Sequence, residues 1–356
     1  MELDFSRQLH FVWALLPEIV LCVWGMIVLI AGVSGKNKEG SDAPTGDPSF
    51  GPRADLGWFT LIGILAASAA NGWLYGVTEV GNTSMIAVDG FRLFANWIFL
   101  LAAALTVLIS FAYIYRQKLQ AGEFYALILF ATAGMMFMAG ARDLIVIFLG
   151  LEVMSIAVYA LTAFNRRDRK SAEAGLKYFL LGAFSTGFFL YGIALTYGAT
   201  GSTNIAAIGD SVASGAATPG LLVLAVALLM VGFAFKVSAV PFHMWTPDVY
   251  EGAPAPVTAW MSAAVKAAAF VVFLRVFLVG FDAAYDSWFP IMWWLAAITM
   301  VAANLIALVQ TNVKRMLAYS SIAHGGYLLV AMTAANENAA AGMLFYLLVY
   351  TLMNMG

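Results

Sequence analysis

Long apolar runs, separated by short stretches rich in polar residues, glycine and proline, recur along this 356-residue chain. A run of 18 or more apolar residues can cross about 30 Å of hydrocarbon as a helix. The pattern predicts about eleven such spans. They cover 11–33, 57–77, 91–115, 122–140, 143–164, 172–197, 220–248, 255–279, 288–311, 315–334 and 339–356. The predicted fold is an all-α, polytopic transmembrane bundle in a lipid bilayer.

Composition agrees with this fold and excludes other classes of protein. Hydrophobic residues make up 62% of the chain and charged residues only 11%, which is too few charges for the surface of a soluble domain. The single cysteine, Cys22, excludes an internal disulfide and a cysteine-bound cluster. The first apolar run lacks a basic leader and a small-residue cleavage site, so we expect a retained helix.

The basic residues outside the spans predict the orientation. If the segment NRRDRKSAE after the fifth span is cytoplasmic, 11 basic residues lie on that side and only Arg7 and Arg142 on the other. The eleven are Lys36, Lys38, Arg53, Arg116, Lys118, Arg166, Arg167, Arg169, Lys170, Lys314 and Arg315. Because cytoplasmic loops carry an excess of Lys and Arg, we expect the N-terminus in a periplasm-like compartment.

Two connections are longer than the rest. Residues 34–56 are rich in Gly, Pro, Lys and Asp, and we expect a mobile loop. Residues 199–219 are polar and small, and we expect them to lie flat at the interface or to form a loop. At the other end of the chain, an apolar run continues to Gly356 without a flanking charge, which suggests a fragment cut within a membrane helix.

The seventh span holds a lysine beside a proline. Lys236 follows about a dozen uncharged residues, too many for easy snorkelling to water. Pro241 lacks a backbone donor and must break or kink the helix just beyond it. Intramembrane charges beside broken helices usually face a bundle interior or a wet cavity and mark an ion path. We therefore interpret Lys236 as a protonatable site.

Glu152 is the natural partner of Lys236. It lies near the middle of the fifth span, more than about 10 Å from either end at 1.5 Å per residue. Burial disfavours an ammonium and a nearby carboxylate favours it. At about 4 Å and an effective dielectric near 20, the attraction is worth about 4 kcal/mol, so small motions of the acid would bind or release a proton. A static ion pair between helices, or a protonated glutamic acid bonding a neighbour, is the plainer alternative.

Four further residues are candidates for the path. Lys266 lies mid-way along the eighth span among small residues, which leave room for close helix approach and water. Lys177 lies about one and a half turns inside the sixth span, where an anchoring role is equally open. His243 follows Pro241 by two, and His324 lies mid-span near hydroxyls. Each imidazole suits proton relay, although a neutral core histidine is an equal alternative.

Two arginines near span ends, Arg92 and Arg275, are interpreted as snorkelling anchors rather than path residues. We find no phosphate-binding glycine loop, no cluster of metal ligands and no histidine pair spaced for haem in the sequence. The prediction is therefore that this chain itself binds no cofactor.

Three segments together resemble one family. They are Lys236–Pro254 (KVSAVPFHMWTPDVYEGAP), the KRMLAYSSIAHGGY run that begins at Lys314, and the segment around Glu152. These segments are similar to the antiporter-like, proton-translocating membrane subunits of respiratory complex I, NADH:quinone oxidoreductase. The resemblance implies a proton half-channel in which the family's roles fall on Glu152, Lys236 and Lys266, with Lys177 often counted.

The resemblance also implies an architecture and a context. Family members have about fourteen spans in two inverted five-helix repeats, which gives a three-span region over 1–121, a first repeat over 122–279 and the start of a second over 288–356. NAD, FMN, iron–sulfur clusters and quinone are expected in partner subunits, and other membrane subunits of the complex are the expected partners. A bacterial inner membrane is the first expectation for location and a mitochondrial inner membrane the second. A cation/proton antiporter subunit is the alternative function, because the same buried lysines serve both.

Overall fold

The computed structural model describes residues 12–35, 52–76, 85–119 and 121–356, and within them the chain is helical with only two isolated β-bridges. Ten of the helical segments in these ranges are long and apolar enough to cross a membrane. The helices are α2 (Leu16–Gly35), α3 (Pro52–Leu74), α4 (Gly90–Gln117), α5 (Ala121–Gly140), α6 (Leu144–Thr162), α7 (Arg169–Thr200), α8 (Ile205–Ala213), α9 (Pro219–Val237), α10 (Thr246–Gly252), α11 (Ala255–Trp260), α12 (Lys266–Arg275), α13 (Tyr285–Leu308), α14 (Val313–Ala334) and α15 (Glu337–Met355). The predicted fold class is confirmed.

The predicted span over 315–334 is α14, which is not among the ten. Its 22 residues give about 33 Å, which is enough to cross. Lys314, Arg315 and His324 lower its mean hydropathy, and α14 packs extensively against α13. The polar residues that weaken its membrane signal are the ones that contribute to the site described below.

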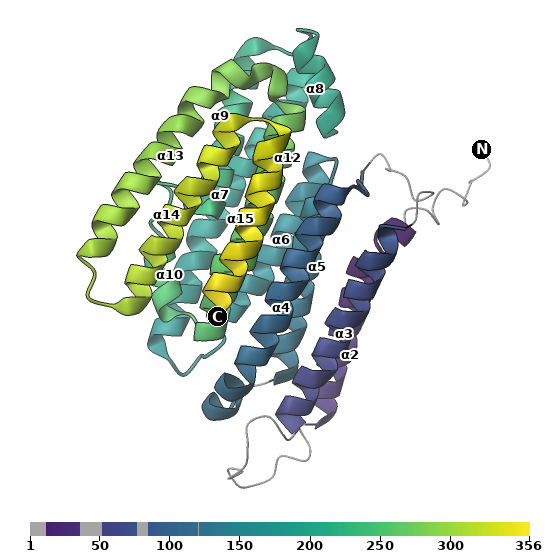
Figure 1. Ribbon diagram of the computed structural model, residues 1–356, viewed down its shortest axis with the longest axis vertical. Helices are drawn as coiled ribbons and strands as arrows, with labels where there is room; N and C mark the ends of the chain where they lie inside the picture. Colours follow the sequence, from purple (N-terminus) through teal and green to yellow (C-terminus); the bar gives the residue numbers. More distant parts are fainter. Residues whose placement is uncertain (1–11, 36–51, 77–84, 120) are drawn as a thin grey trace, which may run out of the picture.

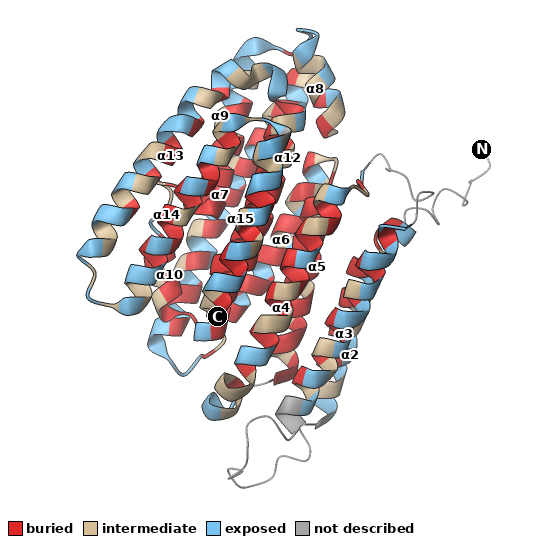
Figure 2. Cartoon of the chain, viewed as in Figure 1, coloured by how far each residue is buried: buried red, intermediate tan, exposed pale blue. Residues whose placement is uncertain are grey.

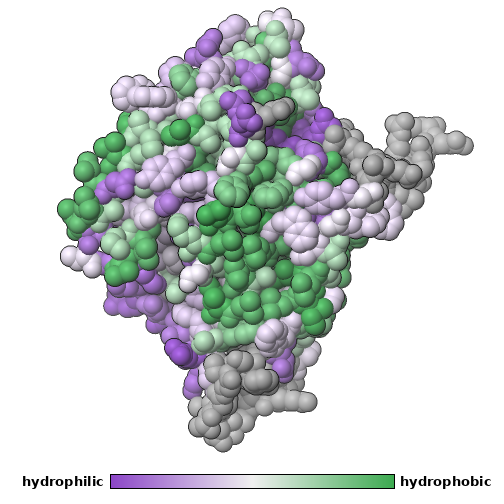
Figure 3. All heavy atoms as spheres, viewed as in Figure 1, coloured by the Kyte–Doolittle hydropathy of each residue, from purple (hydrophilic) through white to green (hydrophobic). Residues whose placement is uncertain are grey.

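The long helices run side by side, with α2 and α3 at one edge of the bundle (Figure 1). The segment over 255–280 is the most buried of the ten and contains α11 and α12, whereas α13 faces outward along much of its length (Figure 2). On the face shown in Figure 3, hydrophobic side chains cover a broad area over α4 and α15, and hydrophilic ones gather toward the ends of the bundle. This distribution is typical of a membrane protein.

The seventh span is broken, as Pro241 predicts. Helix α9 ends at Val237, and Ser238 takes the left-handed conformation (φ 62°) that closes it. Side chains hold the non-helical turn that follows: Trp245 Nε1 donates to the Phe235 carbonyl at 3.0 Å, and Thr299 Oγ1 accepts from the Val240 N–H at 2.9 Å. Short α10 then continues the chain.

Of the two longer connections, the one over 199–219 lies within the described residues. The connection between α7 and α9 contains the short helix α8, whose Asn204 cap accepts from the N–H groups of Ala206 and Ala207. The connection at 36–51, with Lys36 and Lys38, lies outside the described residues, as does Arg7.

Candidate functional site

Lys236 lies in the last turn of α9, immediately before the break, and is only 4% exposed. Its Nζ donates to Ser155 Oγ at 2.8 Å and to the Tyr159 hydroxyl at 3.4 Å, and lies 5.6 Å from the centre of the Tyr159 ring. The ammonium is thus held by hydroxyls and an aromatic face rather than by a carboxylate.

Glu152 is on α6, three residues before Ser155, and the structure does not pair it with Lys236. No ion pair within the described residues includes Glu152, and its Oε1 is buried without a hydrogen-bond partner. Positions three and seven apart share one face of a helix, so Glu152, Ser155 and Tyr159 form one stripe on α6. Ser155 therefore lies about 4.5 Å from Glu152 along the helix axis. The predicted direct contact is wrong in this structure, because the hydrogen bonds of Lys236 Nζ go to Ser155 and Tyr159, further along α6.

Lys266 is the second buried lysine, at 2% exposure. It follows a five-residue π-helical turn, Met261–Val265, and its Nζ donates to the carbonyl and the hydroxyl of Ser321, each at 2.6 Å. π-Helical turns are rare and occur often at functional sites, because they leave backbone groups out of the regular ladder. As for Lys236, no carboxylate within the described part of the chain forms an ion pair with this amine.

A glycine separates the two lysine sites. A Cβ placed on Gly325 would lie 3.1 Å from the Val237 carbonyl oxygen and 4.0 Å from Lys266 Nζ. Val237 is the neighbour of Lys236 at the end of α9. The missing side chain of Gly325 thus lets the end of α9, α14 and the Lys266 amine approach closely.

The two histidines occupy different surroundings. His324 lies on α14 one turn from Ser321, and its Nδ1 is hydrogen-bonded to the Tyr346 hydroxyl, beside the Tyr350 ring. It therefore extends the Lys266–Ser321 group toward α15. His243 lies in the turn after α9, half-buried near the Tyr319 ring, with Nδ1 buried and unpartnered. The structure does not bring His243 into hydrogen-bond contact with either buried lysine.

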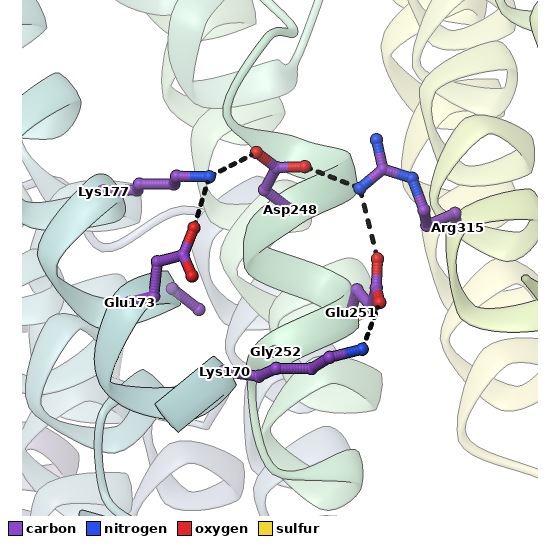
Figure 4. Close-up of a pocket in the computed structure, with 8 residues that line it drawn as sticks. Lys170, Glu173, Lys177, Asp248, Glu251, Gly252 and Arg315 are labelled. Atoms are coloured by element: carbon purple, nitrogen blue, oxygen red, sulfur yellow. Dashed lines mark hydrogen bonds and ion pairs between the residues drawn. The ribbon is translucent and has the colours of Figure 1, made fainter. Parts of the chain in front are cut away.

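Lys177 belongs to a separate, ion-paired cluster where α10 packs between α7 and α14 (Figure 4). Its Nζ lies 2.8 Å from Glu173 and 2.8 Å from Asp248. Arg315 then bridges Asp248 at 2.6 Å and Glu251 at 3.2 Å, and Glu251 accepts from Lys170 at 2.9 Å. These residues surround a hollow of about 230 Å³.

The ion-paired cluster was not predicted, although its acids were visible in the sequence. Asp248 and Glu251 follow the break in TPDVYEG, on the side assigned to the basic loop. Hydrogen bonds from Lys177 and Arg315 hold the pKa of the Asp248 carboxyl below its usual range, and bonds from Lys170 and Arg315 do the same for Glu251. Both acids lie on α10, outside the ten apolar helices, and stay charged at neutral pH.

The two arginines interpreted as snorkelling anchors are ion-paired instead, and that prediction is wrong. Arg92 is fully buried and donates to Glu18 Oε1 at 2.6 Å and to the carbonyls of Ala14 and Ala87. Arg275 makes two parallel bonds, of 2.8 and 2.9 Å, to the Asp89 carboxylate. In the sequence, the signal available for predicting these two ion pairs was the presence of opposite charges near the ends of different spans.

The chain matches the family model for NADH:quinone oxidoreductase/Mrp antiporter, TM, over residues 141–356. NADH-quinone oxidoreductase subunit N of Trichlorobacter lovleyi is 50% identical over 345 residues, covering 96% of this chain and 68% of the relative. Subunit N 1 of Solibacter usitatus is 44% identical over 343 residues, with coverages of 96% and 68%.

Solved structures have the same fold. A chain of respiratory complex I from Thermus thermophilus superposes with a TM-score of 0.76 at 36% identity, over 95% of this chain and 68% of that one. A chain of the Mrp complex from Dietzia sp. gives a TM-score of 0.77 at 21% identity, over 98% and 63%, a likeness of fold alone. The resemblance seen in Lys236–Pro254 is confirmed. The chain belongs to the family of subunit N of NADH-quinone oxidoreductase, among the antiporter-like membrane subunits.

Proposed function

We propose that this chain carries protons across the membrane as a subunit of a redox-driven NADH:quinone oxidoreductase. One observation carries the proposal: two lysines are buried in the helical bundle, each beside an irregular helical turn, and each is held by hydroxyl or carbonyl oxygens. Family membership supports the same function.

The hydroxyl partners of the buried lysines suit proton transfer. Desolvation penalises an ammonium, and a carboxylate beside it would offset that penalty. An amine held only by hydroxyls lacks that stabilisation, so it gives up its proton to an acceptor more readily than an ion-paired amine does. Hydroxyls also donate and accept, so Ser155 and Tyr159 can relay a proton rather than only hold one.

We propose a route that follows the contacts. Glu152 exchanges a proton with Lys236 through Ser155, one turn along α6. The proton then passes the Gly325 gap to Lys266, whose partner Ser321 lies one turn from His324. Lys177 contributes at one end of the bundle, as part of the ion-paired cluster, rather than as a step between the buried amines. His243, in the turn after α9, stays a candidate for the proton path.

The wider context follows from the relatives. We propose that oxidation of NADH and reduction of quinone occur in partner subunits that hold FMN and iron–sulfur clusters, and that other membrane subunits of the complex contact this chain. The bacterial relatives support a bacterial inner membrane, with a mitochondrial one as the alternative. The distribution of basic residues supports a periplasmic N-terminus.

The test compares buried and exposed charged residues in the assembled complex. We expect Lys236→Ala and Glu152→Ala each to lower NADH-driven proton uptake into closed vesicles by about tenfold or more, with quinone reduction falling in step. Arg169→Ala is the control, since Arg169 is an exposed basic residue at the start of α7 and is outside the proposed route. Normal pumping by a Lys236→Ala complex shown to be intact would remove this amine from the mechanism.

A cation/proton antiporter subunit is the second candidate, and the fold shared with the Mrp complex fits it. The two functions differ in their driving force. Under the first, proton uptake requires NADH and stops when quinone reduction is inhibited. Under the second, an imposed Na⁺ gradient would move protons without NADH.

A further inference from the structure

Two connections meet at one end of the bundle, away from the buried lysines. The turn from α4 to α5 and the loop from α6 to α7 are joined by a hydrogen bond from Asn165 Nδ2 to Gln117 Oε1 at 3.4 Å. Two hollows of about 430 and 480 Å³ open here, and they share three lining residues, Lys118, Asn165 and Arg167. The shared wall makes them two halves of one recess, called here the basic recess.

The cations of the basic recess are unusual for this chain. Arg116, Lys118, Arg166 and Arg167 line it and are exposed. Within the described residues, none of these four side chains makes a hydrogen bond or an ion pair. Two acids also line the recess, but Asp168 accepts from the Lys170 N–H as the cap of α7, and Glu123 has contacts of its own. Four positive charges therefore converge without a matching set of carboxylates.

The position of the basic recess suggests what balances them. Helices α4 and α6 end here and α5 and α7 begin here, and all four are long enough to span a membrane. The recess thus lies at the level where lipid headgroups meet the ends of the spans. Part of its wall is apolar, formed by Leu119 and Phe164. Cationic and apolar groups side by side match a headgroup together with the start of its acyl chains.

We propose that the basic recess binds the phosphodiester headgroup of an anionic membrane lipid. Arg167 and Lys118, which line both hollows, contact the phosphate oxygens, and Arg116 and Arg166 flank them from the two connections. Guanidinium groups match phosphate geometry through paired hydrogen bonds, and basic pockets between transmembrane helices are known to bind such headgroups. The site is independent of the proton path, because it shares no residue with it.

Arg167→Gln tests the site, and Arg169→Gln is a matched control two residues away that lines neither hollow. The complete complex is placed in phosphatidylcholine nanodiscs that contain a photoactivatable phosphatidylglycerol. After irradiation, labelled peptides are quantified by mass spectrometry for 113–119 and 162–168. Diffuse attraction to an anionic surface is worth about fivefold per basic residue, and either variant loses that much. We expect Arg167→Gln to lose about tenfold more, since it also loses a charge-assisted hydrogen bond.

Each alternative outcome overturns the proposal in its own way. Equal losses in the two variants would mean that only bulk surface charge attracts the lipid. Unchanged labelling in Arg167→Gln would mean that the recess is not the site. Cross-linking to a neighbouring subunit in place of lipid would point to a protein contact. Quinone reduction at the normal rate shows that both variants are assembled.

Discussion

Lysines occur in two contrasting regions of this protein. Lys170 and Lys177 lie in the ion-paired cluster at one end of the bundle, each with a carboxylate oxygen within 2.9 Å. Lys236 and Lys266 lie inside the bundle, where their nearest polar partners are the oxygens of Ser155, Tyr159 and Ser321. The residue type is the same, but the partners differ in charge.

The contrast shows two different settings for lysine in one fold. In the ion-paired cluster, full charges on both partners hold α10 between α7 and α14. Inside the bundle, neutral hydroxyls satisfy the amine in either protonation state, because a hydroxyl can donate as well as accept. Under the proposed function, the absence of a fixed counter-charge at the amine is what would let its proton exchange.

The largest expected effect comes from giving a buried lysine the partner of a surface one. Ser155→Asp would place a carboxylate within reach of Lys236 Nζ, where Ser155 Oγ now lies at 2.8 Å. At about 4 Å and an effective dielectric near 20 the attraction is about 4 kcal/mol, or about three orders of magnitude in proton release. We expect proton uptake driven by NADH to become undetectable, as measured by dye quenching in vesicles.

Ser155→Ala separates the added charge from the lost hydroxyl. Tyr159 still accepts from Lys236 at 3.4 Å, so we expect only a severalfold decrease in pumping. If the Ser155→Asp complex assembles and pumps normally, Lys236 does not need to release its proton, and the distinction between the two kinds of lysine has no functional meaning.

A smaller effect is expected from narrowing the gap between the two buried amines. In Gly325→Ala the new methyl group would lie 3.1 Å from the Val237 carbonyl oxygen, so one neighbour must shift by a few tenths of an ångström. Overpacking of this kind costs about 1–3 kcal/mol, and we expect pumping to slow about five- to tenfold. Gly342→Ala is the control, since no atom lies within 4 Å of its added Cβ. Equal pumping by both variants would argue against a path past Gly325.

The sequence predicted the elements of this comparison better than their contacts. Apolar runs gave the spans, and Pro241 gave the broken helix beside Lys236, because each depends on local composition. The partner of Lys236 depends on how α6 and α9 are rotated about their axes. Both helices are apolar on nearly every side, so periodicity does not indicate which face of α6 meets the amine. The contact of Lys236 with Ser155, rather than with Glu152, is a difference of one helical turn along α6.

The same limit applies elsewhere. Ion pairs such as Arg275 with Asp89 join residues 186 positions apart, and no local pattern predicts such a pairing. The π-helical turn before Lys266 has no signature in the run of small residues that forms it. The division into 1–121, 122–279 and 288–356 stays a prediction.

The smallest expected effect concerns the ion-paired cluster and its dependence on pH. Asp248 and Glu251 have pKa values lowered by their cationic partners, so the folded state holds these protons less tightly than the unfolded chain does. The stabilisation is therefore present in full above the unfolded values, near pH 4, and is lost as the pH falls through the lower folded values. Asp248→Asn should destabilise the protein by less than about 1 kcal/mol at pH 7, because these pairs are partly exposed.

Thermal unfolding in detergent at a series of pH values would show the wild type and Asp248→Asn converging only below about pH 4. A difference that stayed constant down to pH 3 would mean that the carboxylate charge of Asp248 does not hold α10 in place, and that shape alone distinguishes this cluster from the buried lysines.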